Sequence, residues 1–319
     1  MNMNIDLSQE EVNILTDLAF SVTACPSNTP ELFIHEIKKV SLFLPTRVKE
    51  SLRIFSKGCG FIVVRKIPTT DKPSTPSDNT HHLGEKTIMA KIQAFLNQVL
   101  GEMVAYEAEG YGRLFQDMVP SRVLSQTQTS LSSNIELEIH TEQAFSKFRP
   151  DYLSLACLRG DPNAKTYVFH KNTLLENLSE EKIEMLYKPL WEIGVDMSFK
   201  MNNHVEFLEG NVRGPIPIID KESGDFVFDQ DLMRGITPEA QNLKKEIIEI
   251  YRNKKSEVIL QEGDIVILDN RCVVHGRSSF QPKYDGSDRF IVRSFVMKDY
   301  KKCEYARQNW FRMIEAKYS

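Results

Sequence analysis

Apolar and polar side chains alternate over residues 135–140, as expected of a half-buried β-strand. Residues 288–295 form a second predicted strand, and both of its faces are largely apolar, so we expect this strand to be covered on both sides. A third predicted strand runs through residues 60–65. The chain therefore contains strands of a buried sheet.

Helical periodicity covers residues 8–20 and 30–55, and a further helix is predicted over about 86–101. Two inserted helices are predicted over about 176–193 and 238–255. Thr237 is the expected N-cap of the last one, with Pro238 at its first position. Its apolar stripe, predicted to pack in the core, consists of Leu243, Ile247, Ile250 and Tyr251, while Lys244, Lys245, Glu246 and Glu249 are expected to face water.

Two segments show neither the strand nor the helical period. Residues 68–80, which contain three prolines, are predicted to form a loop. Residues 121–134 are rich in Ser, Thr and Gln and lead into the strand that ends at His140. They are either a solvated loop or a mobile flap over a substrate, and we favour the flap because long loops in compact domains are often functional. Gln128 in this segment is a candidate substrate contact.

Composition is that of an ordinary enzyme. The 319 residues are expected to form a single domain, in which about residues 1–100 support the rest. A net charge of −4 gives no indication of a nucleic-acid partner. No stretch is apolar enough to predict a membrane span, and no signal peptide is expected. The five scattered cysteines are typical of reduced thiols, so we expect a cytoplasmic protein.

The candidate metal ligands lie in the motif His140-Thr141-Glu142 and at the distant His275. Two imidazoles and one carboxylate are the ligand set of a non-haem iron(II) centre, whose opposite face stays open for a cosubstrate and oxygen. Side chains at i and i+2 of a strand share a face, so His140 and Glu142 are expected to bind one ion together. Taken alone, such a triplet is more often a solvated strand edge than a ligand pair.

Arg289 and Arg293 strengthen the metal hypothesis. Both fall on the same face of the strand predicted over residues 288–295. Arginine is rarely buried without a partner, and bidentate hydrogen bonds to carboxylates would offset its desolvation. Two arginines beside an iron centre therefore indicate two small molecules that carry carboxylates.

With these residues in place, the chain resembles the clavaminate synthase-like branch of the iron(II)/2-oxoglutarate oxygenases. Within that branch it is most similar to bacterial hydroxylases of free L-lysine. The resemblance runs from about residue 95 to the C-terminus. Its segments are residues 140–145, 263–270, 274–278 and 280–293 for the branch, and residues 105–110, 115–120, 155–162, 213–218 and 228–235 for the lysine hydroxylases.

The resemblance implies a mainly β fold with flanking helices, namely a double-stranded β-helix (a cupin-like jelly-roll) of two facing sheets. It also implies roles for individual residues. His140, Glu142 and His275 match the iron ligands, Arg289 and Thr166 the partners of the distal carboxylate of 2-oxoglutarate, and Arg293 and Glu109 the partners of the α-carboxylate and α-amino group of an amino acid. Related halogenases lack the carboxylate ligand, so the presence of Glu142 implies hydroxylation.

The partner of the substrate's side chain is less well defined. A buried ammonium needs an acid, and Asp231 and Glu209 are the candidates, with Asp229 third. Asp229 could equally cap a turn. Residues 208–213 lack the denser acidic stretch of related arginine hydroxylases, which favours an ammonium over a guanidinium.

We therefore predict hydroxylation of an unactivated carbon of free L-lysine, with C4 ahead of C3, coupled to conversion of 2-oxoglutarate and O₂ to succinate and CO₂. Another free amino acid, such as arginine, ornithine or asparagine, is the alternative within the same class. A non-catalytic metal-binding barrel that acts as a sensor or scaffold is the alternative outside it. A helix expected around residues 309–314 could pack against a second copy, so a homo-oligomer is possible.

Overall fold

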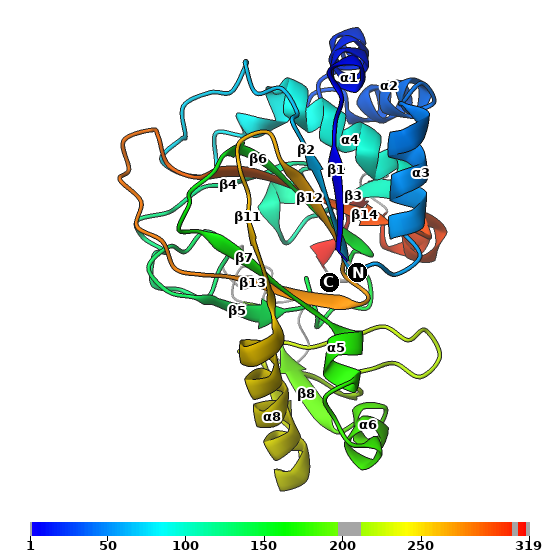
Figure 1. The fold of residues 1–319 in the computed structure, drawn as a ribbon, viewed down its shortest axis with the longest axis vertical. Coiled ribbons are helices and arrows are strands. Elements are labelled where there is room, and N and C mark those ends of the chain that lie inside the picture. Colours follow the sequence, from blue (N-terminus) through cyan, green and yellow to red (C-terminus); the bar gives the residue numbers. More distant parts are fainter. Residues whose placement is uncertain (1, 197–211, 308–311, 317–319) are drawn as a thin grey trace.

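The computed structural model describes residues 2–196, 212–307 and 312–316. Two β-sheets lie face to face, with helices on the outer side of each (Figure 1). The larger sheet has the order β1 (Asn2–Asp6), β2 (Phe61–Arg65), β12 (Ile265–Asp269), β6 (Tyr152–Arg159), β14 (Phe290–Met297), β3 (Glu102–Tyr106) and β15 (Met313–Ile314), and β4 (Gln116–Met118) also pairs with β14. The smaller sheet has the order β11 (Ser256–Ile259), β7 (Lys165–His170), β13 (Val273–Arg277) and β5 (Leu137–His140).

The chain passes repeatedly between the two sheets. From β4 to β14 the strands of these two sheets lie alternately in the larger and the smaller one, except that β7 and β11 are neighbours in the smaller sheet. The strands at the centre of each sheet pair antiparallel, as β6 does with both β12 and β14. Between β7 and β11 the chain makes an excursion, which contains the three-stranded sheet of β10 (Met233–Gly235), β8 (Trp191–Gly194) and β9 (Val212–Ile216).

Apolar side chains fill three layers. The first lies between the larger sheet and α1 (Gln9–Ser21), α2 (Pro30–Ser41), α3 (Thr46–Phe55) and α4 (Ile88–Leu100). The second lies between the sheets and includes Leu153, Val168 and Phe295. The third covers the outer face of the smaller sheet beneath α5 (Lys171–Leu175), α6 (Glu180–Leu186) and α8 (Pro238–Lys254) (Figure 1).

Strand β14 is buried along its whole length, as its sequence pattern predicted. Val292 and Val296 belong to the layer beneath the helices, while Ile291 and Phe295 belong to the layer between the sheets. Arg293 therefore shares the inner face, between the two sheets.

Three predicted elements differ in the structure. The helix expected over residues 30–55 is two helices, because the chain turns at residues 42–45 and Pro45 caps α3. The helix expected over residues 176–193 is limited to α6, since Pro189 follows it and Trp191 begins β8. Residues 313–314, expected to be helical, form β15 beside β3, whereas Asn309, Trp310 and Phe311 lie outside the described residues.

The last inserted helix is confirmed, with one error in its polar face. Thr237 accepts a hydrogen bond from the Ala240 backbone N–H, and Pro238 is the first residue of α8. Lys244 does not face water. It is buried, and its ammonium donates to the Met233 carbonyl, because β10 packs against this side of the helix. In the part of the chain that the structure describes, no helix has the length and apolar character needed to cross a membrane.

Candidate metal centre and its pockets

The two histidines of the predicted centre lie directly opposite each other on neighbouring strands. His140 ends β5 and pairs with His275 of β13. Their ring centroids are 4.5 Å apart, and one ligand atom from each of His140, Glu142 and His275 lies within 4.8 Å of the others. The Glu142 carboxylate is 3.4 Å from Nε2 of His275. The structure thus brings together the three predicted ligands.

Glu142 reaches this position by a route that the sequence argument did not foresee. Strand β5 ends at His140, so the shared strand face invoked for His140 and Glu142 is wrong. Glu142 lies in the following turn, where its backbone N–H donates to Oδ1 of Asn270 at 2.8 Å and its carbonyl accepts from Nδ2 of Asn270 at 3.1 Å. The buried amide of Asn270 therefore positions the carboxylate ligand.

The protonation states suit a metal ion. Nδ1 of His140 lies 2.8 Å from the Glu138 carbonyl, and donation there leaves Nε2 for a metal. Burial alone would raise the pKa of Glu142, but the Arg293 cation and His275 lower it to about 2. Burial, together with His140, lowers the pKa of His275. A carboxylate and neutral imidazoles are the forms that bind metal, and this donor set fits iron(II).

A pocket beside the triad is strongly cationic. Arg289 and Thr166 line it, as predicted, and both are buried. Arg277 lines it as well and was missed, although it lies two residues after His275 on the same strand face, a signal that could have identified it. Burial and the neighbouring Arg289 lower the pKa of Arg277 to about 9. Within the described ranges no carboxylate hydrogen-bonds to either guanidinium, so the pocket is suited to an anion.

A second pocket also adjoins the triad and contains Glu109, together with Arg293, which lines both pockets. Arg293 donates to Glu109, to Glu142 at 3.2 Å and, through Nε, to Gln116 at 2.9 Å. Glu109 also accepts a hydrogen bond of 2.7 Å from Gln143. Burial raises the pKa of Glu109 to about 7, although the Arg293 cation opposes the shift. One cation and one acid, side by side next to an iron ligand, match the two charges of an amino-acid backbone.

Four further acids line this second pocket. Asp229, Asp231, Asp196 and Glu138 line it, and Glu138 was not among the predicted residues. Asp229 accepts the Leu232 backbone N–H at 2.6 Å, so the turn-capping interpretation is correct, yet the same side chain also faces the pocket. Burial raises the pKa of Asp229 to about 6. Glu209, the other predicted acid, lies outside the described residues.

Gln128 lines the same pocket and holds the strand beside it. Its side-chain amide donates to the Glu136 carbonyl at 2.9 Å, and its oxygen accepts from the Glu138 N–H at 3.1 Å. Thr129 and Ser130 continue this wall, so part of the Ser- and Thr-rich segment does lie over the pocket. Its mobility stays a prediction.

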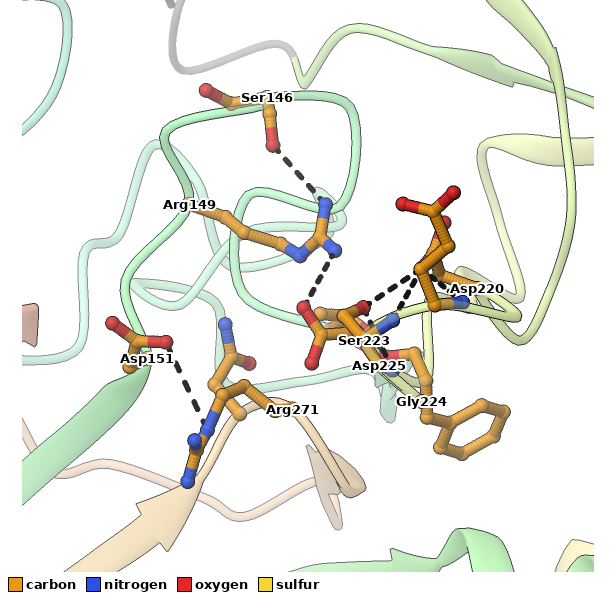
Figure 2. Close-up of polar contacts among 12 residues, drawn as sticks. Ser146, Arg149, Asp151, Asp220, Ser223, Gly224, Asp225 and Arg271 are labelled. Carbon is orange, nitrogen blue, oxygen red and sulfur yellow. Dashed lines mark hydrogen bonds and ion pairs between the residues drawn. The ribbon is translucent and has the colours of Figure 1, made fainter. Parts of the chain in front are cut away.

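The segment that carries Asp229 is anchored to the segment that follows Glu142. Figure 2 shows Arg149 between Ser146 and Asp225, with a distance of 3.5 Å between Arg149 Nη2 and the Asp225 carboxylate. Asp220 organises the turn before this contact through hydrogen bonds from Ser223 (Figure 2). The acidic wall of the pocket is therefore tied to the loop that presents the metal ligand.

Comparison with known proteins agrees with this site. Residues 217–295 match the model of the family described as "Taurine catabolism dioxygenase TauD, TfdA family". An L-lysine 3-hydroxylase of Catenulispora acidiphila is 43% identical over 98% of this chain and 89% of its own length. An L-lysine 4-hydroxylase of Flavobacterium sp. is 24% identical over 86% of this chain and 78% of its own length.

A solved structure of asparagine oxygenase, in complex with Fe(II), (2S,3S)-3-hydroxyasparagine and succinate, aligns with a TM-score of 0.88. It is 26% identical and covers 98% of this chain and 99% of its own. The chain belongs to the TauD/TfdA family of iron(II)- and 2-oxoglutarate-dependent oxygenases. For brevity, the cationic pocket beside the triad is termed the 2-oxoglutarate pocket below, and the pocket that contains Glu109 is termed the amino-acid pocket.

Proposed function

We propose that this enzyme hydroxylates free L-lysine, with C3 as the first candidate position. The observation that carries the proposal is the amino-acid pocket, which is lined by the Arg293–Glu109 pair and by a group of further acids. Such a pocket is complementary to a zwitterion with a cationic side chain. The 43% identity to an L-lysine 3-hydroxylase supports the same substrate.

We infer further that the two facing sheets form a double-stranded β-helix and that residues 1–319 are one domain. The passage of the chain between the sheets supports the first inference. The continuous apolar layer between α1–α4 and the larger sheet supports the second, because it joins the N-terminal third to the strands that carry the site.

Each residue has a distinct task in the proposed reaction. Arg289 and Thr166 bind the distal carboxylate of 2-oxoglutarate, and Arg293 and Glu109 bind the α-carboxylate and α-ammonium of lysine. Asp231 and Glu138 face the side-chain ammonium, and Gln128 closes the wall beside them. Bound iron with 2-oxoglutarate and oxygen supplies the oxidation of the C–H bond, with succinate and CO₂ as the other products. The residues around it select the carbon by holding both ends of the substrate.

The hydroxylated carbon separates two versions of the proposal. The sequence argument placed C4 ahead of C3. Identity of 43% to an L-lysine 3-hydroxylase, against 24% to an L-lysine 4-hydroxylase, supports the opposite order. NMR of the product distinguishes the two positions directly.

The test is succinate formation by the anaerobically iron-loaded protein, supplied with 2-oxoglutarate and oxygen, across a panel of free amino acids. Turnover that depends on lysine and yields a product heavier by one oxygen atom supports the proposal. Turnover with arginine, ornithine or asparagine but not lysine keeps the reaction class and contradicts the substrate. Iron and 2-oxoglutarate binding without turnover on any amino acid favours the sensor or scaffold alternative.

A further inference from the structure

Arg277 stands in a place where an arginine is electrostatically unfavourable. It lines the 2-oxoglutarate pocket together with Arg289, and both guanidiniums approach the ring of Phe280, at 5.0 Å and 6.0 Å from its centroid. Both are buried, at 5% and 8% exposure. Like charges repel strongly where water is excluded, so a second buried cation here requires a reason.

The two arginines differ in what they bind. Nη1 of Arg277 donates to the Ser130 carbonyl at 3.2 Å, Nη2 to the Ser132 hydroxyl at 3.0 Å, and Nε to the Ser278 carbonyl at 3.2 Å. Each of its nitrogens is therefore engaged by an uncharged oxygen. Among the described residues Arg289 has no hydrogen-bond partner. Arg289 is thus available to a ligand, whereas Arg277 is committed to the protein.

Two of the three oxygens that Arg277 holds belong to a segment that forms a wall of both pockets. Residues 128–132, which we call the strap, contain Gln128, Thr129 and Ser130 of the amino-acid pocket. Ser130 also lines the 2-oxoglutarate pocket. Ser132 is fully buried beneath it. A displacement of the strap would therefore change the wall of the amino-acid pocket, although Arg277 itself does not line that pocket.

We propose that Arg277 is a positioning residue whose hydrogen bonds hold the strap in place. A dianion bound at Arg289 strengthens these hydrogen bonds and so raises the affinity of the enzyme for the amino acid. The inference rests on the proposed function. An anion beside Arg289 neutralises the repulsion that Arg277 experiences, which favours the position in which Arg277 holds Ser130 and Ser132. The coupling is reciprocal, so lysine raises the affinity for 2-oxoglutarate by the same factor.

Calorimetry on the anaerobic iron-loaded protein measures this coupling without turnover. The Kd of L-lysine is determined with and without 2-oxoglutarate, and the Kd of 2-oxoglutarate with and without lysine. For the native protein we expect each ligand to tighten the other at least about fivefold, within the usual range of such couplings. In Arg277→Gln we expect the factor to fall to about one, while the Kd of 2-oxoglutarate alone changes far less than the Kd of lysine.

Ser132→Ala is the matched partner variant, because it removes one acceptor of Arg277 and no charge. We expect it to lose part of the coupling, and we expect the double variant to bind lysine no more weakly than Arg277→Gln alone. Additive losses in the double variant would show that the contact does not transmit the effect. If Arg277→Gln does not fold, Ser132→Ala still decides the question.

Hydrogen exchange gives a readout independent of affinity. Addition of 2-oxoglutarate to the native protein should slow exchange of the amides of residues 129–133, and this protection should be lost in Ser132→Ala. A native protein that binds both ligands without coupling would overturn the inference and leave the proposed function intact. So would an Arg277→Gln variant that loses 2-oxoglutarate affinity and keeps the coupling, since Arg277 would then be a ligand of the cosubstrate. Failure of the native protein to bind 2-oxoglutarate would overturn the proposed function itself.

Discussion

The two sides of the metal centre are built from different kinds of structure. On the 2-oxoglutarate side, the polar side chains stand on or next to paired strands: Thr166 on β7, His275 and Arg277 on β13, and Arg289 immediately before β14. On the amino-acid side, Arg293 lies on β14 and Glu138 on β5, but Glu109, Gln143 and Asp231 come from turns and loops. Strands hold a side chain more rigidly than loops do, and loops vary more freely. A shared cosubstrate and a particular substrate are thus recognised by different parts of the fold.

The charges of the two sides differ as well. The 2-oxoglutarate pocket contains Arg277 and Arg289 without a carboxylate partner in the described chain, which suits a dianion. In the amino-acid pocket Arg293 is paired with Glu109, and further acids follow. Burial of an unmatched charge is costly, so each pocket favours the ligand whose charges complete it. Variants on the two sides should therefore separate the binding of the two ligands.

Loss of one protein ligand of the metal should abolish both iron binding and turnover. We expect His275→Ala to lose iron and to reduce succinate formation to background, because only one imidazole and the carboxylate remain. Iron content and turnover are the measurements. His170→Ala is the control, since His170 accepts a hydrogen bond from the Asn172 N–H at the start of α5, outside both pockets. Equal activity of the two variants would exclude the proposed centre.

On the strand-built side, Arg289→Lys should weaken 2-oxoglutarate binding by about 30-fold or more, because truncation of a buried charge partner costs about 2–5 kcal/mol. The lysine side chain keeps the charge but cannot form the bidentate hydrogen bonds. We expect the KM for 2-oxoglutarate to rise, while the KM for the amino acid, measured at saturating 2-oxoglutarate, stays within about threefold. An increase confined to the KM for the amino acid would show that Arg289 binds the substrate and not 2-oxoglutarate.

On the loop-built side, Asp231→Asn should raise the KM for lysine about 5- to 30-fold and leave that for 2-oxoglutarate unchanged. Asp231 is exposed in the ligand-free pocket, so its contribution should lie between those of surface and buried ion pairs, at about 1–2 kcal/mol. The control is Glu246→Gln, which removes the same charge from α8, where Glu246 forms an ion pair with Lys182 of α6. If Asp231→Asn binds lysine normally, Glu138 or Asp229 is the next residue to test.

The difference between strand and loop residues also decides which parts of the site could be predicted from the sequence. A strand pattern places side chains by period, so the faces of β14, including that of Arg293, could be predicted. The pairing of His140 with His275 could not, because the period does not say which strands pair. Glu142 lies beside the two histidines as expected, but for a different reason, because Asn270, 128 residues away, positions it. Glu138 lies two residues before His140 on β5, so the strand period could have identified it. The Arg149–Asp225 anchor depends on how loops meet in space. No periodicity encodes such contacts.

The smallest expected effect is a pH dependence confined to the amino-acid side. Because burial raises the pKa of Glu109 to about 7, this acid loses its charge as the pH falls through neutrality, and it then no longer attracts the α-ammonium of lysine. A single group with that pKa predicts a rise of about fourfold in the KM for lysine between pH 8 and pH 6.5. Glu109 does not line the 2-oxoglutarate pocket, so the KM for 2-oxoglutarate should barely change. Glu109→Gln should raise the KM for lysine at pH 8 and flatten its dependence down to pH 6.5, below which Asp229, with a pKa of about 6, adds a further loss. A profile that keeps its shape in Glu109→Gln would assign the titration to another group and leave Glu109 without a role in binding the ammonium.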